Sequence, residues 1–174
     1  MPTREEYLEL WGEDNTVAVP LAEWKSESPA PPESWPEVDL LPIDMSVAFT
    51  AYLDGEYDPF HRIEHDSRTY VVLGKVPQEP KSTFFVLSLA TGAVHLVNPP
   101  DGTPAKLNSS FATFVRFLHR FAEFVTTDDG LATRPARAEE LERDLKAIDP
   151  AAFDHDDSPW NTAVSFLKTD FQLR

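Results

Sequence analysis

The sequence contains no cysteine, which excludes disulfide bonds, thiolate metal sites and a cysteine nucleophile. It also lacks any run of the ~18 apolar residues that a membrane-spanning helix needs. Residues 1–7 are mostly polar and precede no apolar segment, so we expect no signal peptide. The absence of cysteine fits a reducing compartment, and we expect a cytoplasmic protein with no membrane partner.

Basic residues are scarce. The chain has 15 Lys+Arg against 30 Asp+Glu, a net charge of −15, which argues against binding to nucleic-acid phosphates or anionic lipid. The negative charge has two interpretations: it keeps the protein soluble, or it attracts a cationic protein partner. It is unevenly placed: residues 1–66 hold 16 acids and 3 bases, whereas residues 67–174 hold 14 acids and 12 bases. This asymmetry indicates an interaction surface in the N-terminal part.

Length and composition fit one domain over residues 1–174, because 41% of the residues are hydrophobic and no composition break marks a boundary. Residues 1–66 form an acidic, proline-rich N-terminal part, and residues 67–174 supply most of the predicted elements. Strands are predicted at 16–19, 46–53, 68–76, 83–89 and 93–97, and helices at 3–12, 111–125, 138–148 and 159–171. Strands followed by helices predict an α+β fold with one antiparallel sheet flanked by helices.

Apolar spacing also predicts which residues form the core. The helical periodicity of segments 111–125 and 159–171 places one apolar face of each predicted helix against the strands. We expect these faces to be buried against Val72, Phe85 and Leu87, and their members are Phe114, Leu118, Phe121, Trp160, Val164 and Leu167. Residues 28–36 are too rich in proline for a helix interior or a central strand and are predicted to be extended.

One short motif points to catalysis. His61, Glu64 and His65 match H-x-x-E-H, the inverted zincin pattern, in which two histidines bind zinc and the glutamate is the general base. The pattern requires a helix, but Pro59 and the predicted strand at Arg68 leave room for two turns at most. A solvated turn is the favoured interpretation, and a zinc-dependent hydrolase is the least favoured function.

Other ligand patterns are weaker. Asp54, Glu56 and Asp58 alternate like the start of an EF-hand loop, but proline and histidine occupy the positions that need glycine and glutamate. The acids at 154–157 precede a predicted helix, where the helix dipole favours negative charge. His119 is predicted on the polar side of its helix, and no nucleophile elbow or phosphate-binding loop is present. We therefore expect no catalytic residue, cofactor or metal.

The central segment carries a family resemblance. Residues 70–97 contain Leu-Gly, a strand and Leu-Ala-Thr-Gly-Ala-Val, and Asn108-Ser109-Ser110 then opens a long apolar helix. This arrangement resembles the fourth immunity family of the SUKH superfamily over about residues 70–125. The resemblance implies an α+β domain that binds and neutralises a cognate bacterial toxin, often a nuclease or nucleic-acid deaminase. A non-enzymatic regulatory or scaffold protein on the same fold is the alternative.

A toxin that acts on nucleic acid needs a basic cleft, so the acidic N-terminal part is the predicted binding surface. Tight binding also needs aromatic anchors. Trp35 has an alternative role as a core residue under the proline-rich segment. The sequence indicates neither the toxin's identity nor the oligomeric state. The predicted partner-binding residues are Trp35, Glu37, Asp39, Asp54, Glu56, Tyr57 and Asp58.

Overall fold

The computed structural model describes residues 2–45, 49–51, 60–77, 83–98, 102–156 and 158–169. The N-terminal part begins with helix α1 (Arg4–Trp11), which Thr3 caps and Gly12 ends, as the capping-box spacing predicts. Strands β1 (Thr16–Ala18) and β2 (Leu40–Pro42) pair antiparallel. Helix α2 (Leu21–Glu27) and the 3₁₀ turn η2 (Pro32–Ser34) lie between them in sequence.

A five-stranded antiparallel sheet follows in the order β3-β4-β5-β6-β7, so each strand pairs with its neighbour in the sequence. The predicted α+β class is confirmed, but the prediction of one sheet is wrong because β1 and β2 form a second one. The short strands β2, β3 and β7 have too few residues to show a clear period in the sequence. The five strands are β3 (Arg62–His65), β4 (Arg68–Lys75), β5 (Phe84–Ser88), β6 (Val94–Val97) and β7 (Ala105–Asn108).

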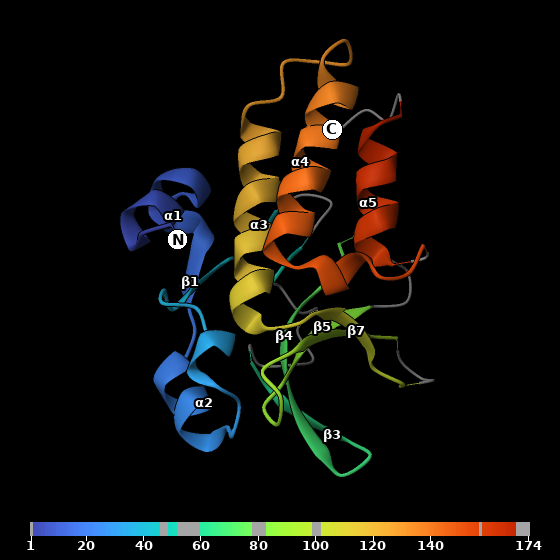
Figure 1. Cartoon of the computed structure of the whole chain (residues 1–174). Coiled ribbons are helices and arrows are strands. Elements are labelled where there is room, and N and C mark those ends of the chain that lie inside the picture. Colours follow the sequence, from blue (N-terminus) through green and yellow to red (C-terminus); the bar gives the residue numbers. More distant parts are fainter. Residues whose placement is uncertain are drawn as a thin grey trace.

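Three helices form a layer on this sheet (Figure 1). Helices α3 (Phe111–Thr126), α4 (Arg134–Ile148) and α5 (Pro159–Leu167) lie side by side, with the 3₁₀ turn η3 (Pro150–Phe153) between the last two in sequence. Helix α1 lies on the other side of α3 from α4, and α2 lies further along the same edge. Helix α1 therefore extends the helical layer, whereas α2 lies beside the sheet, where Arg62 of β3 pairs with Glu23 and Glu27.

The core is mostly as predicted. All six predicted helix residues are buried, and Phe85 and Leu87 belong to the same apolar cluster. Val72 is also buried, but its placement against the helices is wrong because it faces the opposite side of the sheet, with Tyr70 and Val86. Val71 lies opposite Leu87 across the β4–β5 pair, so Val71 shares the helix-facing side and Val72 is turned away.

Two glycines allow close approach of neighbouring segments. A Cβ on Gly74 would lie 2.4 Å from the carbonyl oxygen of Thr50, next to a bulge in β4. Gly92 has φ +73 in the turn between β5 and β6, a conformation that favours glycine, and a Cβ there would meet Ser34 at 2.7 Å. At both positions the five-stranded sheet thus packs closely against the N-terminal part.

The Asn-Ser-Ser segment before α3 is part of a buried polar network. The Asp149 carboxylate at the end of α4 accepts hydrogen bonds from the Ser109 amide (2.7 Å), the Ser109 hydroxyl (2.8 Å), the Thr113 hydroxyl (2.9 Å) and the Asn108 amide group (3.3 Å). The Trp160 indole of α5 donates to the Asn108 side-chain oxygen at 3.1 Å. These bonds connect β7, α3, α4 and α5.

Candidate functional site

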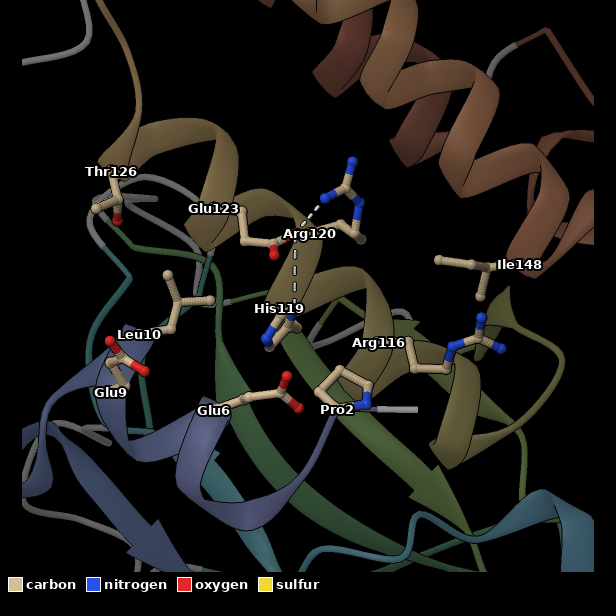
Figure 2. A pocket seen from close by; sticks show the side chains of 10 residues that line it. All are labelled: Pro2, Glu6, Glu9, Leu10, Arg116, His119, Arg120, Glu123, Thr126 and Ile148. Carbon is tan, nitrogen blue, oxygen red and sulfur yellow. Dashed lines mark hydrogen bonds and ion pairs between the residues drawn. The ribbon is translucent and has the colours of Figure 1, made fainter.

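A cleft of about 690 Å³ lies where α1 approaches α3 (Figure 2). Both helices and the end of α4 contribute side chains, and charged groups of both signs dominate the lining. The acids are Glu6, Glu9 and Glu123, the bases are Arg116 and Arg120 with His119 beside them, and the remaining residues are Pro2, Leu10, Thr126 and Ile148. The cleft is large enough for several side chains of a ligand.

Aromatic packing fixes α1 beside the cleft. Tyr7 and Trp11 are one helical turn apart and both buried, with ring centroids separated by 4.7 Å. The Tyr7 ring meets His119 edge-on at 5.0 Å, and burial raises the pKa of its hydroxyl to about 12. The capping box, in which the Glu6 carboxylate accepts from the Thr3 amide at 2.6 Å, then places Glu6 at the edge of the cleft.

The prediction that His119 lies on a polar helix side is wrong, since it is 7% exposed under α1. Burial lowers its pKa, the Glu123 carboxylate opposes this shift, and Arg120 reinforces it. The His119 Nδ1 lies 3.7 Å from the Glu123 carboxylate (Figure 2). A lowered pKa favours the neutral imidazole at pH 7. The helical period of α3 alone could not reveal this burial, because α1 covers that side from far away in sequence.

The two arginines of the cleft differ in their partners. Arg120 forms ion pairs with Glu123 and with Asp144 of α4. Arg116 is half-buried and makes no hydrogen bond or ion pair with any residue that the structure describes. It therefore presents its guanidinium to the cleft with its donors available.

The structure separates the predicted partner-binding residues. Trp35 is 4% exposed and meets Phe111 edge-on at 6.5 Å, so it belongs to the core and offers no surface anchor. Glu37 is exposed, and Asp39 is half-buried in an ion pair with Arg4. Four predicted residues lie outside the described part of the chain, namely Asp54, Glu56, Tyr57 and Asp58.

The H-x-x-E-H segment forms no helix. Residues 62–65 of this segment form the edge strand β3, so the predicted turn is wrong. The helical geometry that the zincin pattern requires is therefore not formed. The Arg62 guanidinium binds Glu23 at 2.9 Å and Glu27 at 2.7 Å on α2, and the Thr69 hydroxyl donates to Glu64 at 2.6 Å. Over the described ranges, no group of three or more histidine, aspartate or glutamate side chains could hold a metal ion.

These features define an α+β domain with an acidic N-terminal layer and a cleft of mixed charge beside it. The family model of the SUKH-4 immunity proteins matches residues 5–166, nearly the whole chain. The chain therefore belongs to the SUKH-4 immunity protein family. Searches of the curated proteins and of the solved structures gave no significant match. Among the described residues, no helix is both long and apolar enough to cross a membrane.

Proposed function

We propose that this protein neutralises a cognate bacterial toxin by binding it and occluding its functional cleft. The observation that carries the proposal is the match to an immunity family over residues 5–166. The toxin class that best fits the charge of this chain is a nuclease or a nucleic-acid deaminase, because such a protein presents a basic surface to phosphates. An acidic immunity protein competes for that surface.

The acidic N-terminal layer supports this assignment. Residues 2–45 contain eleven acids and two bases, and ten of the eleven acids are exposed. Both bases are engaged, Arg4 by Asp39 and Lys25 by the Pro36 carbonyl at 3.2 Å. The surface that these residues form thus carries a strong negative field, which accelerates encounter with a basic partner. Salt screens this attraction over ~8 Å at physiological ionic strength.

We propose that Glu37 and Asp39 of this layer contact the toxin together with Asp54, Glu56 and Asp58, with Tyr57 as an aromatic anchor; the last four residues lie outside the described part of the chain. Aromatic side chains desolvated at an interface contribute most to slow dissociation, whereas exposed acids act mainly on the association rate. Trp35 is omitted because it is buried in the core.

The test uses a toxin encoded by a gene adjacent to that of this chain, where one is found, inactivated by mutation. All five acids are changed to the corresponding amides, and association is measured at several salt concentrations. We expect a lower association rate and a shallower salt dependence. The matched control changes five acids elsewhere, Asp129, Glu139, Glu140, Asp154 and Asp156, which are exposed in the C-terminal part. Equal effects of the two sets would contradict a role for this particular surface.

Occlusion itself is tested by co-expression. The wild-type chain is expected to restore growth of cells that express the active toxin and to inhibit the purified toxin at equimolar concentration. Failure to bind the toxin or to protect against it would overturn the proposed function.

A further inference from the structure

We infer that the cleft between α1 and α3 binds a short segment of the toxin, and that Arg116 holds a carboxylate of that segment. The inference rests on the proposed function, which supplies the toxin as partner, and it adds a second contact to the acidic surface. The occupant is a polypeptide segment that carries one aspartate or glutamate beside an apolar side chain.

The size of the cleft favours a polypeptide over a single ion. Its volume of about 690 Å³ is many times the ~30 Å³ that one water molecule occupies in the liquid. Apolar side chains also line it, with Leu10 on α1 and Ile148 at the end of α4. An isolated anion would leave these surfaces uncovered, whereas a segment of several residues covers them and gains from their burial.

The charges of Arg116 and its surroundings indicate which group the segment presents. Arg4, Arg62, Arg120, Arg134 and Arg137 each bind at least one carboxylate. Among the described residues, Arg68, Arg116 and Arg143 form no ion pair, and of these three Arg116 is the one that lines the cleft. Arg116 lines the same cleft as three acids and is bound by none of them. Its guanidinium lies toward Ile148, on the opposite side of the cleft from Glu9 (Figure 2). A guanidinium in a partly enclosed position binds a carboxylate through two parallel hydrogen bonds.

The acids of the cleft restrict the occupant further. Glu6, Glu9 and Glu123 make the cleft unfavourable for a free anion, and the whole protein carries a net charge of −15. A carboxylate attached to an otherwise basic protein avoids this repulsion, because neighbouring cations of the toxin face the same acids. A segment of a basic toxin can therefore place a carboxylate at Arg116 and cations near the acids of the cleft.

The experiment measures binding of the inactivated toxin to Arg116→Ala and to Arg116→Gln, which keeps more of the side chain for packing. Losing one partner of a desolvated charge pair raises Kd by about thirtyfold or more, mainly through faster dissociation. We expect this increase for both variants and a partial recovery for Arg116→Lys, which keeps the charge but loses the paired hydrogen bonds. The matched control is Arg143→Ala, which removes an exposed arginine from α4 and is expected to change Kd by less than about twofold.

A mutant cycle then identifies the toxin's side of the contact. Toxin carboxylates are changed singly to amides, and one of these changes is expected to have little further effect once Arg116 is absent. Thermal unfolding of each variant shows whether it is folded. If Arg116→Ala is unfolded, the glutamine and lysine variants decide the result.

The outcomes separate this inference from the proposed function. If the wild-type chain does not bind the toxin, both are wrong. If it binds and the Arg116 variants behave like Arg143→Ala, the cleft inference alone is wrong and the acidic surface remains. Inorganic phosphate, compared with chloride at equal ionic strength, is expected not to compete. Specific competition by phosphate would show a general anion site and overturn the assignment of a polypeptide segment.

Discussion

Replacing Asp149 with alanine is expected to destabilise the domain strongly, because this buried carboxylate accepts four hydrogen bonds from β7 and the start of α3. Three of the four are between 2.7 and 2.9 Å and one is 3.3 Å. A hydrogen bond to a charged group contributes ~1.5–3 kcal/mol. Ser109 and Thr113 are only half-buried, so water replaces part of what they lose. We therefore expect the free energy of unfolding to fall by about 3–5 kcal/mol.

The measurement is urea unfolding followed by tryptophan fluorescence, because the Trp160 indole belongs to the same network. Asp149→Asn keeps an accepting oxygen but removes the charge and is expected to lose about half as much stability. Asp154→Ala, at an exposed position a few residues further on, is the control and is expected to stay within about 0.5 kcal/mol of wild type. An Asp149→Ala protein as stable as this control, with an unchanged urea dependence, would refute a stabilising role for the network.

Three further changes test other parts of the fold. Trp35→Ala is expected to cost about 3–5 kcal/mol in urea unfolding, because the side chain is 4% exposed; a stable variant with weakened toxin binding would instead show an interface role. Gly74→Ala is expected to lower the melting temperature by several degrees, since a Cβ would lie 2.4 Å from the Thr50 oxygen, and an unchanged melting temperature would contradict this. Burial lowers the pKa of His119 in the folded state, so the unfolded chain binds the proton more tightly. Stability should therefore fall as the pH decreases below about 6.5, and His119→Asn should flatten this dependence; an equal slope in both proteins would contradict the assignment.

The sequence predicts the elements whose pattern is long or whose ends carry specific residues. Helix α3 repeats its apolar positions over four turns, and of the three residues Asn108, Ser109 and Ser110 that could cap it, Ser110 does so. The Thr3–Glu6 capping-box spacing and the Ser158-Pro159 pair are likewise local signals, and in the structure they lie at the starts of α1 and α5. In these cases local chemistry and tertiary packing favour the same conformation, so one sequence suffices to locate the element.

The remaining features depend on contacts between distant segments. Helix α2 has seven residues and no side-chain cap. It is therefore stabilised by the packing of Leu21 and Trp24 and not by its intrinsic helix propensity. The burial of His119 requires α1, and the acceptor role of Asp149 requires β7 and α3. The apolar periodicity within α3 or α4 cannot predict which distant segments contact His119 and Asp149. The same reasoning explains why Arg116 was absent from the predicted binding residues.

The order of the five-stranded sheet has a consequence for how quickly the protein becomes active after synthesis. Each strand pairs with the one that precedes or follows it, so successive hairpins close short loops at low entropic cost. Domains rich in such local pairing reach the native state faster than those that must first join distant strands. The proposed function requires the chain to be folded by the time the toxin becomes active. A sheet whose strands pair in chain order suits a protein that must fold before its partner becomes active.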